Sequence, residues 1–274
     1  MWIGNESIDL RLVLIDSAQS FSWKEVNGAF YGTAGNRAIK FSQNSEGIFA
    51  EGADKAFCRN YLDLDRDYQG IAAEFAHVEC AMRAMKLYPG MRVLNQDPWE
   101  MILTFILSAN NNVGRIKTLV DALSELLGEK YVLDDVEIHG FPDAVRLASA
   151  DEAALRAIGV GYRAPYLIKT ARMVADGFPV TDLRQMDYES AHKLLTTLPG
   201  VGDKVADCVQ LFGCRHSCAF PVDVWVERLL KSWFGLEKCA KKHMPAAARE
   251  LLGPNCGIMQ QFLFHAARTG DMEL

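Results

Sequence analysis

The sequence predicts an α+β protein in which a small N-terminal antiparallel β-sheet domain packs on a larger all-α body. Two observations support this fold class. Apolar residues alternate within the first ~65 positions, which is strand periodicity, and from about Gln69 they recur every three or four positions, which is helical periodicity. We therefore expect a β domain at residues 1–68 and a helical domain at residues 69–274.

Four segments of the N-terminal domain have strand character. Ile8–Ile15 alternates between apolar and polar positions, which predicts a strand. Ala29–Gly32 and Ala38–Phe41 flank a turn rich in glycine and asparagine, which is typical of a hairpin. Gly47–Ala50 predicts one more strand, so the segments together indicate a small antiparallel sheet.

Several helices of the second domain have recognisable ends. Asp97 can cap a helix whose first turn contains Pro98, and Glu100 can complete a capping box. The apolar run after Glu100 indicates a helix that is buried on most sides. A leucine-rich helix ends at Gly128. Further helices are predicted at 151–158, 163–176, 188–196, 204–213, 224–234, 244–252 and 258–268.

The composition argues against several classes of protein. No apolar run reaches the roughly 18 residues of a membrane span, and the first residues lack the pattern of a secretion signal. The seven cysteines are odd in number and irregularly spaced, which indicates reduced thiols rather than a disulfide framework. They include no C-x-x-C pair, which argues against a zinc site. We therefore expect a cytoplasmic protein with no membrane partner. The formal net charge of −6 weighs only weakly against nucleic-acid binding, because phosphate contact needs just a local basic face.

A glycine-punctuated turn, L-P-G-V-G at residues 198–202, joins the helices predicted at 188–196 and 204–213. Gly200 and Gly202 permit a tight path and the close approach of a ligand to backbone N–H groups. Those amides and the following helix N-terminus favour an anion. The turn resembles the helix–hairpin–helix motif, about 188–213, which binds DNA backbone phosphate without reading sequence. A plain pair of antiparallel helices is the alternative.

Lys204 and Asp223 are candidate catalytic residues. Lys204 lies in the first turn of a helix, where the helix dipole and any burial favour the neutral amine, which is a nucleophile. A solvated surface lysine is the structural alternative. Asp223 follows Pro221-Val222 and suits the N-cap of the helix at 224–234, a role that would also hold its carboxylate rigidly.

The string L-P-G-V-G-D-K-V-A-D-C at 198–208, continued by P-V-D-V at 221–224, resembles the 8-oxoguanine DNA glycosylase/AP-lyase family of the helix–hairpin–helix DNA glycosylase superfamily. Three further segments agree in matching order. These are Q-S-F-S-W at 19–23, D-P-W-E at 97–100 leading to S-A-N-N-N at 108–112, and G-V-G-Y-R-A at 159–164. The resemblance extends from residue 19 to residue 264.

This resemblance implies a bifunctional base-excision repair enzyme. A damaged guanosine is flipped out of the duplex, and the Lys204 amine attacks its C1′ carbon and displaces the base. Asp223 favours the neutral lysine and stabilises positive charge that develops on the sugar. The resulting Schiff base permits β-elimination and strand nicking. No metal or organic cofactor is needed, although carbonyls of the hairpin turn could hold a structural ion.

The resemblance also implies DNA-binding residues. Asn110 would enter the space left by the flipped base, and Tyr162 would stack as a wedge at the opened step. Arg115 and Arg163 would hold the orphaned cytosine, whose O2 and N3 atoms accept hydrogen bonds. A helix cap, an aromatic core contact and solvated arginines are the respective structural alternatives.

The lesion pocket matches the family with two departures. Cys208 and Phe264 would sandwich the damaged base and Gln260 would bond its Watson–Crick edge, although the residues alone suggest core positions for Cys208 and Phe264. Ala18 stands where the family usually has a glycine whose carbonyl accepts the N7–H of 8-oxoguanine. Trp225 stands where many relatives have histidine, so phosphate contact is reduced there or the ring shapes the lesion pocket.

The expected partner is double-stranded DNA containing oxidised guanine, bound by a monomer. Two alternatives stay open. One is a glycosylase of the same superfamily for another lesion, although those with an iron–sulfur loop need four C-terminal cysteines and only Cys239 and Cys256 follow residue 220. The other is a non-enzymatic DNA-binding protein that uses the hairpin alone.

Overall fold

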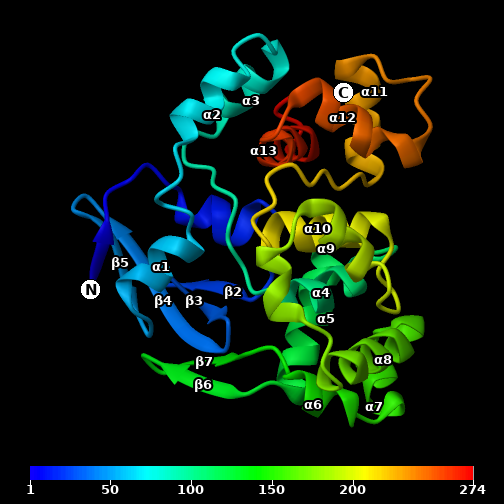
Figure 1. The fold of residues 1–274 in the computed structure, drawn as a ribbon. Helices are drawn as coiled ribbons and strands as arrows, with labels where there is room; N and C mark the ends of the chain where they lie inside the picture. Colours follow the sequence, from blue (N-terminus) through cyan, green and yellow to red (C-terminus); the bar gives the residue numbers. More distant parts are fainter. Residues whose placement is uncertain (274) are drawn as a thin grey trace.

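A five-stranded antiparallel sheet forms the N-terminal part of the protein (Figure 1). The computed structural model describes residues 1–273, and the strand order of this sheet is β1-β5-β4-β3-β2. The predicted hairpin is confirmed, because β3 and β4 pair antiparallel from Phe30 opposite Phe41 to Ala34 opposite Arg37. The strands are β1 (Trp2–Gly4), β2 (Trp23–Val26), β3 (Ala29–Ala34), β4 (Arg37–Asn44) and β5 (Gly47–Glu51).

The strand predicted over Ile8–Ile15 is wrong. This segment is helical, and its last part, Leu12–Asp16, is a π-helical turn in which the Ser17 N–H donates to the Leu12 carbonyl at 2.8 Å. Asp9 accepts from the N–H of Leu12 at 2.9 Å, which stabilises the start of the helix. The alternation fails at Val13, which is as buried as its neighbours, so apolar side chains face more than one direction.

Every helix that the sequence predicted is present, together with helices at 55–61 and 144–148 and one hairpin that it did not predict. The described residues form α1 (Lys55–Tyr61), α2 (Tyr68–Glu74), α3 (Glu79–Leu87), α4 (Pro98–Ser108), α5 (Val113–Leu127), α6 (Ala144–Ala148), α7 (Glu152–Ala157), α8 (Ala164–Ala175), α9 (Tyr188–Leu195), α10 (Asp203–Gly213), α11 (Val224–Phe234), α12 (Met244–Leu252) and α13 (Cys256–Thr269). The added hairpin, β6 (Lys130–Leu133) and β7 (Val136–His139), extends from the helical part toward the sheet, where Lys40 pairs with Asp134 (Figure 1).

Glu100 links the two parts instead of completing a capping box, so that prediction is also wrong. Asp97 caps α4 as expected, accepting from Trp99 N–H at 2.9 Å. The Glu100 carboxyl turns to the sheet and accepts from the N–H of Gly35 at 3.0 Å. Burial raises the pKa of Glu100 well above its usual range, and the nearby Asp97 adds to this. The contact with Gly35 joins elements that are distant in sequence, which local capping rules do not consider.

Helices α4 and α10 pack together at the centre of the larger part, and α11–α13 lie on one side of them together with α2 and α3 (Figure 1). A smaller core under the sheet is formed mainly by residues from Ile3 to Leu64. The division of the chain at residue 68 stays a prediction. Among residues 1–273, no helix has both the length and the apolar character needed to cross a bilayer.

Candidate active site and DNA-binding surface

A cavity of about 850 Å³ opens between α4, α10, the start of α11, α13 and the turn around Ala18. Side chains that are far apart in the sequence meet on its walls. The structure brings eight of the predicted site residues together there: Ala18, Asn110, Lys204, Cys208, Asp223, Trp225, Gln260 and Phe264. The other predicted residues, Arg115, Tyr162, Arg163, Gly200 and Gly202, lie outside this lining.

Lys204 lies half-buried in the first turn of α10, with its amine at the cavity wall. Its Nζ atom donates to Ser108 Oγ at 3.1 Å and lies 5.0 Å from the centre of the Phe105 ring. The Ser108 hydroxyl in turn donates to the Phe105 carbonyl at 2.8 Å, so its lone pairs are free to accept from the amine. Ser108, which was not among the predicted site residues, therefore orients the Lys204 amine. The only signal for it is its position before the asparagine run.

Asp223 is the N-cap of α11, as predicted. Its Oδ1 atom accepts from the N–H of Val226 at 2.8 Å, which fixes the carboxylate at the cavity edge. Among residues 1–273, the second oxygen, Oδ2, accepts no hydrogen bond, and the Lys204 amine forms its hydrogen bond with Ser108 and no ion pair with this carboxylate. The amine and the carboxylate thus line one cavity without neutralising each other by direct contact.

The deeper part of the cavity has apolar walls and one unpaired acceptor. Cys208 lies one helical turn after Lys204, and burial raises the pKa of its thiol to about 12, so the thiol stays protonated and behaves as a small apolar group. Gln260 on α13 is only 4% exposed, and its Oε1 atom accepts no hydrogen bond. A buried unpaired acceptor costs about 1–3 kcal/mol. This oxygen is therefore ready to accept a donor from a bound molecule.

A second group of predicted residues connects the segment between α4 and α5 with the segment between α7 and α8. Asn110 has a left-handed backbone (φ 53°), and its Nδ2 atom donates to the Tyr162 hydroxyl at 3.0 Å. Tyr162 is 47% exposed, which suits a side chain that stacks on a partner. Arg115 is exposed and donates to the Gly159 carbonyl at 3.1 Å.

Arg163 differs from the other predicted DNA-binding residues because it is buried, with 6% exposure. Its Nε atom donates to the Ala109 carbonyl at 3.0 Å and its Nη1 atom to the Val160 carbonyl at 3.2 Å. The guanidinium therefore holds the loop before Asn110 in place. A contact between Arg163 and an orphaned base stays a prediction.

The two hairpin glycines are required for different reasons. Gly200 has φ 86°, and a Cβ atom there would lie 2.9 Å from Cβ of Tyr166, so the fold itself demands glycine. Gly202 is the exposed N-cap of α10, and an added Cβ would meet nothing within 4 Å. Packing within the chain therefore does not require glycine at 202, and the N-terminus of α10 beside it is open to solvent.

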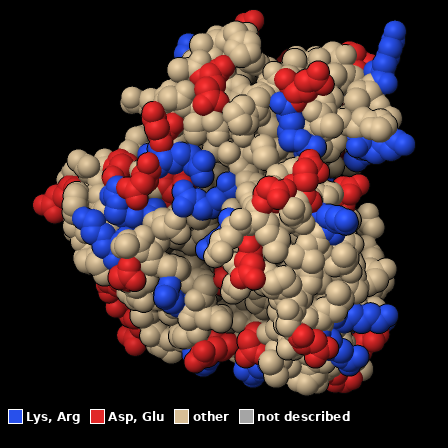
Figure 2. All heavy atoms as spheres, viewed as in Figure 1, with Lys and Arg blue, Asp and Glu red and all other residues tan. Residues whose placement is uncertain are grey.

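Trp225 lies next to Asp223 in the first turn of α11 and is 40% exposed. The Arg228 guanidinium lies 5.7 Å from the centre of its indole ring. Basic and acidic side chains are intermixed over the face shown in Figure 2, so no single-sign patch dominates that view. Within residues 1–273, no three His, Cys, Asp or Glu side chains are grouped to hold a metal ion.

Residues 103–254 match the family described as HhH-GPD superfamily base excision DNA repair protein, and residues 2–102 match the 8-oxoguanine DNA glycosylase N-terminal domain. The chain belongs to the HhH-GPD superfamily. Its fold is similar to that of the 8-oxoguanine glycosylase/lyase of Clostridium acetobutylicum, solved with double-stranded DNA containing cytosine opposite 8-oxoguanine. The two share 29% identity and a TM-score of 0.91, over 97% of this chain and 94% of the clostridial one.

Curated members of the superfamily are similar as well. A probable N-glycosylase/DNA lyase of Methanothermobacter thermautotrophicus is 34% identical over 67% of this chain and 66% of its own length. The N-glycosylase/DNA lyase of Saccharomyces cerevisiae is 39% identical over 53% of this chain and 43% of its own length. The N-glycosylase/DNA lyase of Arabidopsis thaliana is 31% identical over 91% of this chain and 75% of its own length. The chain thus spans just under two thirds of the archaeal relative and less than half of the yeast one.

Proposed function

We propose that this protein removes 8-oxoguanine from double-stranded DNA, opposite cytosine, and then nicks the strand at the resulting abasic site. The observation that carries the proposal is the shared cavity, in which the Lys204 amine and the Asp223 carboxylate lie beside the unpaired Gln260 oxygen. A cavity of about 850 Å³ has room for a flipped nucleotide. Similarity to the clostridial glycosylase/lyase supports the same substrate.

The chemistry follows from the positions of the two catalytic residues. The Nζ lone pair of Lys204 forms a bond to C1′ while the bond from C1′ to N9 breaks and the base leaves with its electron pair. Positive charge develops on the sugar in this step, and the Asp223 carboxylate stabilises it because its second oxygen is unpaired. After the amine loses a proton, the C1′–O4′ bond breaks and the sugar ring opens, which gives a Schiff base at C1′. Loss of a C2′ proton then lets the C3′–O bond break, so the strand is nicked and the downstream fragment leaves with a 5′ phosphate.

The pocket supplies recognition of the base. Cys208 and Phe264 contribute apolar surfaces suited to the two faces of a purine, and the Gln260 oxygen accepts an N–H from its Watson–Crick edge. The carbonyl of Ala18 accepts the N7–H that 8-oxoguanine has and guanine lacks. The two bases differ little in shape, so this single bond carries much of the discrimination.

The remaining predicted residues bind the DNA around the lesion. Gly200 and Gly202 present the N-terminus of α10 to a backbone phosphate. Asn110 and Tyr162 fill the gap in the duplex, and Arg115 donates to the orphaned cytosine. Because residues of one chain line the cavity, we further propose that the enzyme acts as a monomer. We also propose that it acts on DNA in the cytoplasm.

Borohydride trapping tests the proposal. Reduction of the Schiff base should link the unaltered protein covalently to a duplex containing 8-oxoguanine, whereas Lys204→Gln should give no adduct. The exposed Lys238→Gln is a matched control and should trap normally. Normal trapping by Lys204→Gln would overturn the assignment of the nucleophile. An adduct that forms only with a different lesion would show that 8-oxoguanine is not the substrate. DNA binding without any adduct would favour the non-enzymatic alternative.

A further inference from the structure

The backbone around Ala18 is held by three side chains from distant segments. Ala18 itself has a left-handed backbone (φ 59°), which alanine rarely adopts. The carbonyl of Asp16 accepts from Nη2 of Arg268, and that of Ser17 accepts from Nε2 of Gln261 at 2.8 Å. On the other side of Ala18, the carbonyl of Gln19 accepts from Nε2 of Gln96 at 2.7 Å.

The Ala18 carbonyl is the exception in this run of four. Among residues 1–273 it accepts no hydrogen bond, although the carbonyls before and after it are all bound. Ala18 lines the cavity that holds Lys204, and so do Gln261 and Arg268. The turn therefore has fixed carbonyls on both sides and one unused carbonyl between them.

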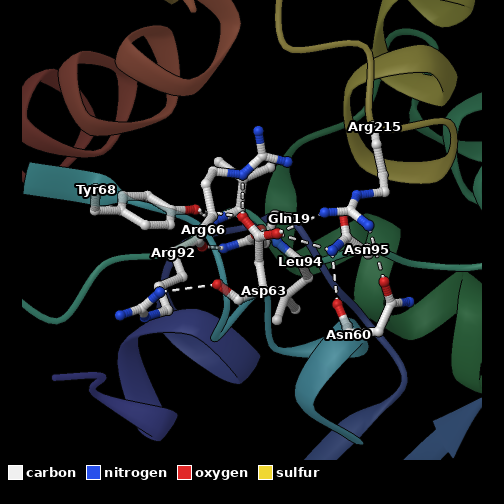
Figure 3. A network of polar contacts seen from close by, with 10 residues as sticks. Gln19, Asn60, Asp63, Arg66, Tyr68, Arg92, Leu94, Asn95 and Arg215 are labelled. Carbon is white, nitrogen blue, oxygen red and sulfur yellow. Dashed lines mark hydrogen bonds and ion pairs between the residues drawn. The ribbon is translucent and has the colours of Figure 1, made fainter. Parts of the chain in front are cut away.

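The frame behind this turn is a network of buried polar groups (Figure 3). The Gln19 amide donates to the Arg92 carbonyl at 2.9 Å, and its oxygen accepts from Leu94 N–H at 2.8 Å. Asn95 and Arg92 are tied to Asp63, a residue only 2% exposed, by bonds of 3.0 Å and 2.8 Å. The irregular segment at 92–96 is fixed by these bonds, and Gln96 at its end holds the turn.

We infer that Gln261, together with Arg268 and Gln96, is a positioning residue that aims the Ala18 carbonyl at the N7–H of the oxidised base. This inference rests on the proposed function. A left-handed alanine is strained, so without its neighbours the turn relaxes toward an ordinary conformation and the carbonyl rotates away. The bonds to the Asp16, Ser17 and Gln19 carbonyls oppose that rotation.

Helix α13 consequently has two functions at adjacent residues. Gln260 has an unpaired oxygen at the cavity wall, whereas the amide nitrogen of Gln261, which is 2% exposed, donates to the Ser17 carbonyl. The helix that reads the Watson–Crick edge thus also fixes the group that reads N7–H. Removing the Gln261 amide should weaken base recognition while leaving the Lys204 chemistry intact.

Single-turnover kinetics on two duplexes test this inference. Gln261→Met keeps the side-chain length but removes the donor. We expect base excision from an 8-oxoguanine–cytosine duplex to slow about tenfold, the effect of one lost hydrogen bond. Cleavage of a preformed abasic site opposite cytosine should change less than about twofold, because no base is present there for the Ala18 carbonyl to bind.

Two further variants complete the design. Gln96→Met removes the bond on the other side of Ala18 and should give the same selective loss. Gln43→Met is the matched control, because it removes a similar amide-to-carbonyl bond of 3.0 Å, to Ile8, away from the cavity. A parallel loss on both duplexes, or unchanged excision in Gln261→Met and Gln96→Met, would overturn the positioning role. Absence of excision by the unaltered protein would instead refute the proposed function.

Discussion

The hairpin before Lys204 and the turn around Ala18 both form tight backbone structures beside the site, but they are maintained differently. In the hairpin, glycine occupies the left-handed position at 200, and the backbone bonds itself, with Val201 N–H donating to the Leu198 carbonyl at 3.0 Å. In the turn, alanine occupies the left-handed position, and side chains from α13 and from Gln96 hold the chain.

This difference shows how the same kind of geometry can have a local or a tertiary origin. A glycine adopts φ above zero without strain, so the left-handed residue of the hairpin needs no side chain to hold it. Residues of α8 only support the hairpin from outside, with Thr170 Oγ1 donating to the Pro199 carbonyl at 2.9 Å and Tyr166 packed beside Gly200. An alanine in that region is disfavoured by roughly 1–2 kcal/mol, so the turn depends on partners that folding brings to it. The backbone conformation at Gly200 should therefore tolerate the loss of side-chain partners better than the backbone conformation at Ala18.

Asp223→Asn should have the largest effect on base excision. It tests a residue whose position depends on local sequence, because Asp223 is the N-cap of α11. Asparagine is as good an N-cap as aspartate, so thermal stability should hardly change. Removal of the charge should slow base excision by about a hundredfold or more in single-turnover assays. Asp187→Asn at the N-cap of α9 is the matched control. Excision at the unaltered rate would show that the carboxylate does not stabilise the transition state.

Gly202→Ala should weaken DNA binding about tenfold without loss of stability, because a Cβ there meets no protein atom but obstructs a phosphate. Fluorescence anisotropy with a lesion-containing duplex measures the affinity. Gly200→Ala should instead lower the free energy of unfolding by about 1–2 kcal/mol, since it forces alanine into the left-handed region. If both variants lost only stability, the proposed contact between Gly202 and phosphate would be wrong.

Arg115→Ala should reduce the preference for cytosine opposite the lesion by about fivefold or more, because the donor to the orphaned base is removed. Excision rates opposite each of the four bases give this ratio. Arg156→Ala nearby removes an exposed arginine that pairs with Glu152, and it should leave the ratio unchanged. An unaltered profile in Arg115→Ala would remove its assigned role.

Ala18→Gly should have the smallest effect on excision. It places glycine in the left-handed position of the turn, as in the hairpin at Gly200. Glycine relieves the left-handed strain but gains freedom in the unfolded chain, so unfolding free energy should rise by less than about 1 kcal/mol. Excision should stay equal or become faster, because the carbonyl is kept. Ala246→Gly, at an exposed position of α12, should lower stability by about 0.5–1 kcal/mol. A strong loss of excision in Ala18→Gly would contradict the role of that carbonyl.

Local signals predicted much of the helical part. The caps at Asp97 and Asp223, and the end of α5 at Gly128, lie where the sequence indicated, because a cap satisfies N–H or C=O groups within a few residues. The strand expected over Ile8–Ile15 failed because alternation alone does not distinguish a strand from a short buried helix. The Glu100 capping box failed because Gly35, distant in sequence, competes for the carboxyl.

The sequence by itself determined the hairpin, the placement of Lys204 at a helix start and of Asp223 at a cap, since these depend on residues within one or two turns. Only the tertiary structure decided that Ser108 orients the amine, that Arg163 is buried against the Ala109 carbonyl, and that Gln261 binds the Ser17 carbonyl. Each of these bonds joins segments separated by more than fifty residues. No local propensity encodes such contacts, because they form only when the apolar faces of the helices pack and exclude water from the polar groups between them.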